Sequence, residues 1–235
     1  MAYAPSIDMN HVRNNYVRKQ IIRLAGDFDF ISLREKEPAE ILSQWLNKRV
    51  STVLDPSLLL NAHEWEKHMA FSDNGTDNKY CVIYMLGQNE EYWREIYRIS
   101  DELGLVPKII PVYTKDLERK GCIKNHAGPA EFLRIFKEAS FVCTDSFHGM
   151  LFSIIFHVNF ITFQRFTSND PRNQNFRIFN IARLLSLENR IYDGNNSAYI
   201  MKSAINFHEV DAKLKLLREN SLNWLKTALN STKIR

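Results

Sequence analysis

The sequence predicts an α/β fold built on a doubly wound, parallel β-sheet. Short apolar runs bounded by turn-forming residues recur along the chain, and segments with the 3.6-residue apolar period of helices separate them. Residues 80–86 are apolar without alternation, which is typical of strands that are buried on both faces in parallel sheets. Strands that alternate with helices form βαβ units, so we expect helices on both faces of the sheet.

The individual elements follow from these periods. The expected strands are residues 28–33, 50–54, 80–86, 109–112, 141–144 and 160–163, with a short strand at 191–192. The expected helices are residues 15–24, 38–46, 61–68, 89–103, 129–139, 148–156, 177–185 and 210–229. Asn61 is placed to cap one helix, and Gly104 is placed to end another. The polar, turn-rich stretch 72–78 is the best boundary between two domains.

Composition narrows the class of protein. Of the 235 residues, 45% are hydrophobic and 25% charged, which is the balance of a globular protein and excludes disordered and collagen-like chains. The formal net charge of +4 comes without a dense Lys/Arg run, so the sequence does not favour a nucleic-acid partner. Three cysteines without metal-ligand spacing indicate a reducing, cytoplasmic location. The longest apolar stretch, residues 150–156, is far shorter than the ~20 residues that span a bilayer.

A polar loop follows the expected strand 141–144 at its carboxyl end, where ligands bind in doubly wound sheets. The free N–H groups at the start of the next helix form a seat for a carboxylate or a phosphate. His148 in this loop can transfer a proton near neutral pH. A structural alternative stays open at this point: Asp145 or Ser146 caps the helix, Gly149 permits close packing, and His148 is a structural imidazole.

The residues around this loop resemble those of a known family. Residues 142–154, Val-Cys-Thr-Asp-Ser-Phe-His-Gly-Met-Leu-Phe-Ser-Ile, are similar to the signature of the polysaccharide pyruvyl transferases. Residues 31–36, Ile-Ser-Leu-Arg-Glu-Lys, resemble the family's SxRE strand end, and residues 54–60 resemble its DPTLLL crossover. Residues 128–133 match the segment that precedes the signature strand. These ordered motifs cover most of the chain.

The resemblance implies two Rossmann-like domains arranged as in GT-B glycosyltransferases, with the site in the cleft between them. Residues 1–71 are then the remnant of the N-terminal domain with the crossover, and residues 72–235 are the C-terminal domain with the donor site and the final helix. The SxRE strand of this family usually follows more than a hundred residues, so we expect an N-terminally truncated chain. Such a truncation would put the activity of this chain alone in question.

The resemblance also implies a reaction. Phosphoenolpyruvate is the donor, a pair of glycan hydroxyls is the acceptor, and the product is a pyruvate ketal on a cell-surface polysaccharide such as a capsule or exopolysaccharide. No cofactor is expected beyond this donor substrate. Since no histidine clusters with carboxylates at metal-ligand spacing, no metal site is expected either.

The family's functional residues carry over to the signature loop. His148 resembles the histidine assigned to acid–base chemistry and donor contact. Asp145 is either a general base for a sugar hydroxyl or a residue that orients His148, and we favour orientation. Ser146, Phe147 and Gly149 are the expected donor-binding neighbours. Some relatives carry Arg-Leu before the histidine where this chain has Ser146-Phe147, so we expect backbone N–H groups together with Arg165 or Arg177 to replace that arginine.

Three arginines are candidate donor-binding residues. Arg34 resembles a family arginine that contacts the donor, and a planar guanidinium suits a carboxylate or phosphate. Arg165 follows an expected strand at its carboxyl end, and Arg177 begins an expected helix. Each could instead form an ordinary surface ion pair, which for Arg34 would involve Glu35 or Glu37.

Other functions fit the same architecture. A glycosyltransferase would use a nucleotide sugar, although no acidic ribose clamp follows a glycine-rich turn here. A non-catalytic fragment would bind a glycan or a partner chain. The acceptor of a pyruvyl transferase is a glycan or a lipid-linked oligosaccharide. The basic final helix could then lean peripherally on the inner face of the cell membrane, although docking on its own domain is favoured.

Overall fold

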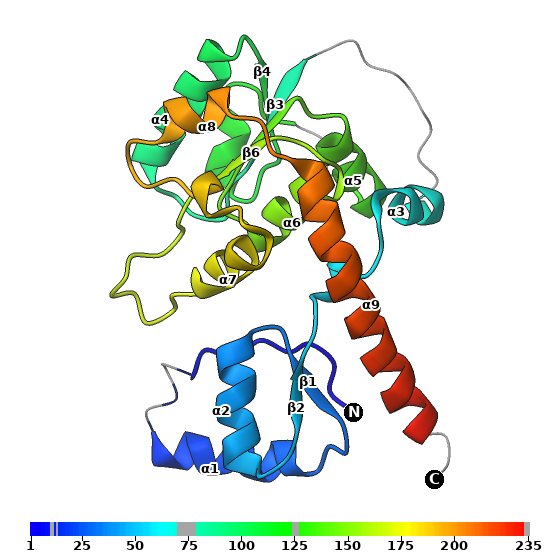
Figure 1. Cartoon of the computed structure of the whole chain (residues 1–235). Helices are drawn as coiled ribbons and strands as arrows, with labels where there is room; N and C mark the ends of the chain where they lie inside the picture. Colours follow the sequence, from blue (N-terminus) through cyan, green and yellow to red (C-terminus); the bar gives the residue numbers. More distant parts are fainter. Residues whose placement is uncertain (10–11, 13, 70–78, 124–126, 233–235) are drawn as a thin grey trace. The chain divides into compact units, whose positions relative to one another are not determined.

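The computed structural model describes residues 1–9, 12, 14–69, 79–123 and 127–232, and Figure 1 shows its elements. The chain forms two compact units, which we treat separately. The first unit combines Met1–Leu59 with Val210–Arg235, and the second is Leu60–Glu209. The boundary predicted at residues 72–78 lies outside the described residues. The assignment of domains to residues 1–71 and 72–235 stays a prediction.

The second unit is built on a parallel sheet, as the apolar runs predict. Its strands are β3 (Tyr80–Tyr84), β4 (Val106–Ile109), β5 (Phe141–Thr144) and β6 (Phe160–Thr162), in the order β4-β3-β5-β6. All neighbouring pairs are parallel, and Tyr84 lies beside Thr144, which lies beside Thr162. The carboxyl ends of these three strands are therefore level. Loops that leave them meet at one edge of the sheet.

The strand predicted at residues 109–112 is misplaced. The structure puts β4 at Val106–Ile109, so the strand ends where the prediction began it. Pro107, which lacks an N–H donor, pairs with Cys81 from the edge of the sheet, where a proline is tolerated. The predicted strand at 191–192 is an isolated bridge between Thr162 and Ile191.

Helices cover both faces of this sheet. The helices of the second unit are α3 (Ala62–Met69), α4 (Glu90–Glu102), α5 (Pro129–Lys137), α6 (Phe147–Ile155), α7 (Phe176–Leu185) and α8 (Ser197–Lys202). Short 3-10 helices, absent from the sequence prediction, lie at Thr114–Glu118 and Glu188–Arg190 in this unit and at Pro56–Leu58 in the first unit. Figure 1 shows α4 and α8 on one side of the sheet and α5 and α6 on the other. The doubly wound prediction is confirmed for this unit.

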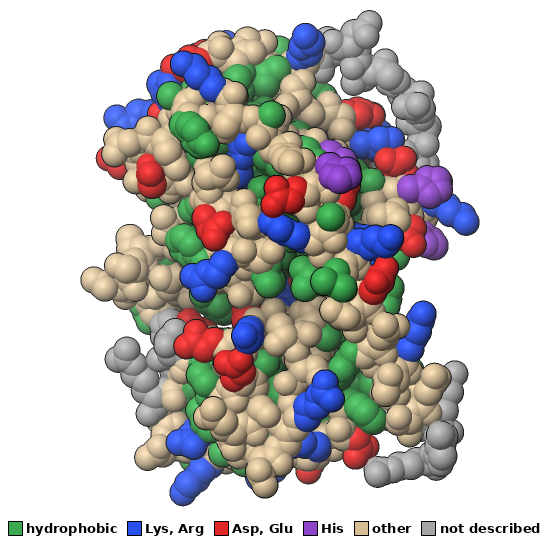
Figure 2. Space-filling view, viewed as in Figure 1, with side chains coloured by type: hydrophobic (Ala, Val, Ile, Leu, Met, Phe, Trp, Pro, Cys, Tyr) green, Lys and Arg blue, Asp and Glu red, His purple; other side chains and the backbone are tan. Residues whose placement is uncertain are grey.

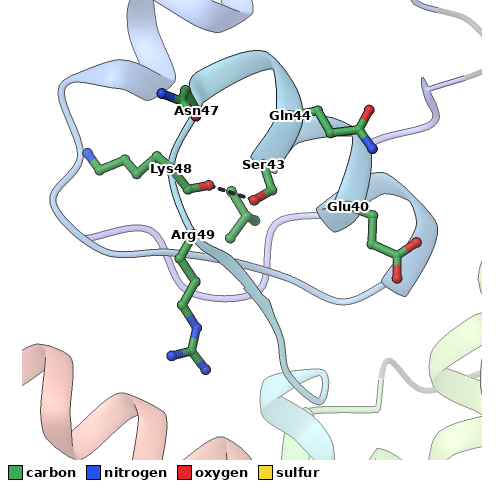
Figure 3. A pocket seen from close by; sticks show the side chains of 7 residues that line it. Glu40, Ser43, Gln44, Asn47, Lys48 and Arg49 are labelled. Carbon is green, nitrogen blue, oxygen red and sulfur yellow. Dashed lines mark hydrogen bonds between the residues drawn. The ribbon is translucent and has the colours of Figure 1, made fainter.

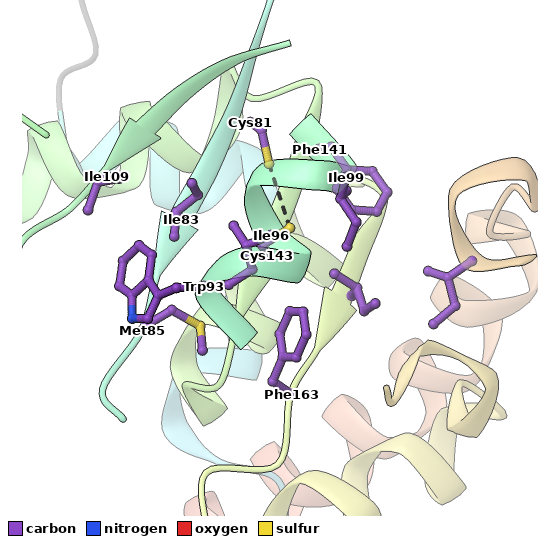
Figure 4. Packing of buried hydrophobic residues seen from close by; sticks show 12 residues of the cluster. Cys81, Ile83, Met85, Trp93, Ile96, Ile99, Ile109, Phe141, Cys143 and Phe163 are labelled. Atoms are coloured by element: carbon purple, nitrogen blue, oxygen red, sulfur yellow. Dashed lines mark hydrogen bonds between the residues drawn. The ribbon is translucent and has the colours of Figure 1, made fainter. Parts of the chain in front are cut away.

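The helices packed on both faces of β3 explain why apolar and polar residues do not alternate along this strand. Cys81 and Ile83 face α4, where they pack in a cluster with Trp93 and Ile96 (Figure 4). Tyr84 faces the opposite way, and its ring lies 5.2 Å from that of Phe132 in α5. Successive strand residues point to opposite faces, so a strand covered on both sides is apolar throughout. Cys81 is fully buried and free, as expected for a small core residue.

Helix ends follow the predicted signals. Asn61 accepts a hydrogen bond from the Glu64 N–H at 2.9 Å, and the Glu64 carboxylate accepts one from the Asn61 N–H at 2.8 Å. This reciprocal capping box begins α3. Gly104 follows α4 with a φ of +63°, the left-handed conformation that a glycine adopts at little cost.

The first unit contains a smaller parallel sheet. Its strands are β1 (Ile31–Leu33) and β2 (Val50–Thr52), and its helices are α1 (Asn15–Gly26) and α2 (Lys36–Leu46). Ala2 forms a parallel bridge with Ile31 on the other side of β1. The core combines Leu33 of β1 with Ala39 and Leu42 of α2. Acidic and basic side chains are interspersed on the face shown in Figure 2.

The final helix, α9 (Phe207–Thr232), belongs to the first unit from Val210 onward. The Ser221 hydroxyl accepts a hydrogen bond from the Leu54 N–H at 2.9 Å, and Arg218 Nε donates to the Leu58 carbonyl at 2.8 Å. The predicted domain of residues 72–235 includes this helix, and that assignment stays a prediction. Among the described residues, no helix combines the length and the apolar character that a membrane span needs.

Ser221 offers a test of this packing. The change Ser221→Ala leaves the buried N–H of Leu54 without its acceptor, which we expect to lower the free energy of unfolding by about 1–3 kcal/mol. Ser231 on the same helix is exposed, so Ser231→Ala is a matched control with an expected effect within about 0.5 kcal/mol. Urea unfolding measures both variants, and equal losses would contradict the packing.

Candidate active site

The predicted signature loop lies at the topological switch point of the second unit. From β3 the chain passes to β4 on one side and then to β5 on the other side. Loops that leave two adjacent strands in opposite directions open a crevice, and ligands bind there in doubly wound sheets. Residues 85–89 follow β3 and residues 145–146 follow β5. The sequence prediction of a site at the carboxyl end of β5 therefore coincides with the position that the topology favours.

Asp145 fastens these two loops together. Its Oδ1 accepts a hydrogen bond from the Leu86 N–H at 2.6 Å, and its Oδ2 accepts one from the Gly87 N–H at 2.7 Å. A Cβ at position 87 would lie 2.7 Å from Oδ2, so only glycine allows this approach. Sequence reasoning missed Leu86 and Gly87. The available signal was a glycine just after a buried strand.

Burial raises the pKa of the Asp145 carboxyl, whose side chain is only 1% exposed. The Leu86 and Gly87 N–H groups and Arg165 oppose this shift, because they stabilise the charged form. Arg165 Nη2 also donates to the Asp145 carbonyl at 3.2 Å. The pKa of Asp145 is therefore higher in the folded state than in the unfolded state. The contribution of Asp145 to the free energy of unfolding decreases as pH rises from the ordinary aspartate pKa through this raised pKa.

The start of α6 is fixed by a chain of short contacts. The Thr144 hydroxyl donates to the Tyr84 carbonyl at 2.6 Å and accepts from the Ser146 N–H at 3.0 Å. The Ser146 hydroxyl accepts from the Gly149 N–H at 3.3 Å, which caps the helix. A Cβ at position 149 would lie 2.3 Å from Thr144 Oγ1. Ser146 thus caps and Gly149 permits close packing, while their contact with a donor stays a prediction.

A small cavity opens beside this helix start. It is lined by Asp145, Phe147, Arg165, Phe166, Gln174, Asn175, Arg177 and Ile178. Its volume is about 10 Å³, room for about one water molecule, so a larger ligand would require the lining side chains to move apart. The structure therefore brings together Phe147 and two of the three predicted arginines. A second, wider groove in the first unit, near Ser43 and Lys48, is open and polar, and no predicted site residue lines it (Figure 3).

Guanidinium groups and aromatic rings alternate in the small cavity. The Arg177 guanidinium lies 5.6 Å from the centre of the Phe147 ring, and that of Arg165 lies 5.4 Å from the centre of the Phe166 ring. Gln174 accepts a hydrogen bond from Arg177 Nη2. The planar, charged groups are held by their neighbours, and they suit a small anion that also has an apolar part.

Most of the sequence matches the model of one protein family. The sequence model of the polysaccharide pyruvyl transferases matches residues 1–165 of the 235 residues. The chain belongs to this family. The match includes the signature loop and ends at Arg165 within the second unit, so the resemblance seen in the individual motifs is confirmed, and Arg177 lies beyond the matched residues.

Comparison of this pyruvyl transferase family member with solved structures gives distant likenesses. UDP-GlcNAc 2-epimerase of Methanocaldococcus jannaschii is 17% identical over 79% of this chain and 54% of its own, with a TM-score of 0.45. The wall teichoic acid polymerase TagF is 14% identical over 98% of this chain and 65% of its own, with a TM-score of 0.47. The chain thus spans about half to two-thirds of these proteins. Likeness at this level supports no conclusion about function, and the GT-B arrangement of the units stays a prediction. No curated protein matches the sequence.

His148 of the family signature is exposed on the first turn of α6. Its ring centre lies 5.5 Å from that of Phe147, a cavity-lining residue. The imidazole is therefore accessible beside the cavity, and its catalytic role stays a prediction. The sequence also suggests His126 as a weak acceptor-side candidate, and this residue lies outside the described residues. Among the described residues, no group of three or more metal-ligating side chains occurs.

Arg34 of the SxRE motif lies in the first unit and forms an ion pair with Asp55 of the DPTLLL-like motif. Asp55 is buried, and its other oxygen accepts a hydrogen bond from the Ser57 N–H at 2.9 Å. The predicted surface alternatives were Glu35 and Glu37, but Glu35 is itself buried and accepts from a serine hydroxyl at 2.8 Å. The two motifs are thus joined where β1 and β2 end.

Gly149 gives a test of the geometry around the signature. The change Gly149→Ala pushes a methyl group into Thr144, so we expect a loss of about 1–3 kcal/mol in the free energy of unfolding. Gly26→Ala adds the same methyl group at the end of α1, where nothing lies within 4 Å, and should leave stability unchanged or slightly raised. Thermal unfolding compares the two, and a tolerated Gly149→Ala would contradict the close approach.

Proposed function

We propose that the protein transfers the pyruvyl group of phosphoenolpyruvate to a sugar of a cell-surface polysaccharide or of its lipid-linked precursor, with a pyruvate ketal as product. Family membership supports the reaction class. The single observation that carries the donor assignment is that Arg165, Arg177 and Phe147 line one cavity at the switch point. No cofactor and no metal take part in this proposal.

The chemistry of the cavity matches that of phosphoenolpyruvate. The donor carries a carboxylate and a phosphate, and guanidinium groups bind both with charge-assisted hydrogen bonds. It also carries an apolar methylene group, for which the Phe147 ring offers a wall. Arg165 keeps 22% of its side chain exposed while its Nη2 is fixed on the Asp145 carbonyl, so its direction is set before the donor arrives.

Ketal formation makes one carbon–hydrogen bond and two carbon–oxygen bonds and breaks the bond between carbon and the phosphate oxygen. The methylene carbon of phosphoenolpyruvate gains a proton and becomes a methyl group, and the oxygen of one sugar hydroxyl bonds to the central carbon. The bond between that carbon and the phosphate oxygen then breaks, and the second hydroxyl closes the ketal ring. One of the two hydroxyl protons restores the acid that protonated the methylene carbon. The other leaves with the released phosphate.

The residues divide these tasks. We assign proton transfer and donor contact to His148, because its imidazole is exposed next to the cavity-lining Phe147 and an imidazole can donate or accept a proton. Asp145 acts as a positioning residue, since both of its oxygens accept backbone N–H groups and its side chain is buried. Ser146 and Gly149 hold the helix start at the donor. Arg34, fixed by Asp55, is proposed as a further donor contact from the first unit.

The acceptor is a glycan or a lipid-linked oligosaccharide with two hydroxyls that a single carbon can bridge. A lipid-linked acceptor would bring the protein to the inner face of the cell membrane as a peripheral, cytoplasmic enzyme.

Variants of His148 test this proposal in the full-length protein. Phosphate release from phosphoenolpyruvate should require an acceptor oligosaccharide, and the product should gain a pyruvate ketal in mass spectrometry. His148→Ala should lower kcat by about 10²–10⁴-fold, as expected for the loss of a general acid–base group. His208→Ala, at an exposed histidine of α9, is the matched control and should leave kcat unchanged. A near-normal rate for His148→Ala would remove His148 from the mechanism, and ketal-free products throughout would refute the reaction.

A further inference from the structure

We propose that the loop after β4, with Tyr113 at its centre, is the platform on which the acceptor sugar binds. This inference rests on the proposed function, because it names the second substrate's subsite. Three of the exposed large apolar side chains of the second unit lie within this one loop: Val112 at 40%, Tyr113 at 38% and Leu117 at 46% exposure. Apolar side chains gathered on a surface in this way mark a binding site more often than isolated ones do.

The platform is joined to the donor site through one residue. The Tyr113 hydroxyl donates a hydrogen bond to the Leu86 carbonyl at 2.8 Å. Leu86 in turn donates its own N–H to Asp145, the residue that fastens the switch-point loops. The acceptor hydroxyls must reach the central carbon of the donor, so the acceptor has to bind next to the donor cavity. Through these two hydrogen bonds the exposed Tyr113 is connected to Asp145, which lines the donor cavity.

The Tyr113 ring is held in place rather than free to move away. The buried carboxylate of Asp116 accepts hydrogen bonds from the N–H groups of Val112 and Tyr113, at 3.1 Å and 2.9 Å. The loop is also fixed to the start of α4, because Arg119 Nη2 lies 2.6 Å from Glu90 Oε1. A ring that is already ordered loses little conformational entropy when a ligand stacks on it.

Polar groups beside the ring suit sugar hydroxyls. Glu90 is exposed, and a hydrogen bond from Arg119 is the main reason why the pKa of its carboxyl is lowered. An ionised carboxylate accepts hydrogen bonds from hydroxyl groups, and the Lys115 ammonium, 3.3 Å from Glu90, donates them. A sugar ring offers both an apolar C–H face for the tyrosine and a rim of hydroxyls for these groups.

The charges of this surface also favour a neutral ligand. The acidic and basic side chains of the loop and its α4 contact balance: Glu90, Asp116 and Glu118 against Lys115, Arg119 and Lys120. An anionic ligand would find no excess of positive charge here, in contrast to the cavity with Arg165 and Arg177. The proposed donor and acceptor subsites therefore differ in charge as well as in position.

Steady-state kinetics of the full-length protein with an acceptor oligosaccharide tests the platform. Tyr113→Ala removes the ring and should raise the KM for the acceptor roughly tenfold, which corresponds to a stacking contribution of about 1.4 kcal/mol. Tyr113→Phe keeps the ring and should change that KM less than about threefold. The KM for phosphoenolpyruvate should stay unchanged in both. Tyr199→Ala, at an exposed tyrosine of α8, is the matched control and should alter neither KM.

A second platform variant and a direct binding measurement test the same proposal independently of the Tyr113→Ala kinetics. Leu117→Ala removes part of the platform without touching the hydrogen bonds of Tyr113, so it should raise the acceptor KM by a smaller factor even if Tyr113→Ala does not fold. Saturation-transfer NMR of the oligosaccharide, without phosphoenolpyruvate, should show binding that Tyr113→Ala weakens. A wild-type enzyme that forms the ketal while neither variant changes the acceptor KM would overturn the platform. Tyr113-dependent binding without any ketal would instead refute the proposed reaction and leave the platform standing.

Discussion

The second unit depends on one buried carboxylate that joins two loops. Parallel strands end together at one edge of a sheet, but nothing in the strand pairing fixes the loops that follow them. Asp145 supplies this missing constraint, because its two oxygens accept the N–H groups of Leu86 and Gly87 from the neighbouring loop. Burial makes the charged carboxylate costly, and these hydrogen bonds together with Arg165 offset that cost. The walls of the candidate site are thereby set before any substrate binds.

This constraint connects the two proposed subsites. On one side of the fastened loops, Arg165 and Arg177 line a cavity suited to a small anion with an apolar part. On the other side, Leu86 accepts the hydrogen bond that orients the Tyr113 ring. Both substrates of a ketal-forming transfer must meet at one carbon atom, and a shared, rigid loop is a simple way to fix their separation. The first unit also has a buried aspartate at the end of a parallel strand: Asp55 forms an ion pair with Arg34 where two parallel strands end.

Much of the fold could be predicted from local sequence, whereas most partners could not. The apolar run at residues 80–86 predicts a strand covered on both faces, and Asn61 is predicted to cap a helix; both features occur. The signature loop was placed correctly at a strand's carboxyl end. Its contact with Gly87 could not be foreseen, because strand order decides which loops become neighbours. The partner of α9 and the exact limits of β4 likewise depend on packing between distant segments.

Amide hydrogen exchange of the wild-type protein tests the central constraint most directly. If Asp145 fastens the loop after β3, the amides of Leu86 and Gly87 should exchange about as slowly as that of Ile83 within the strand. The amide of the exposed Gln88, one residue further on, provides the reference for an open loop and should exchange much faster. Exchange of Leu86 and Gly87 at the rate of Gln88 would contradict the account, since the two hydrogen bonds that define the site would then not persist in solution.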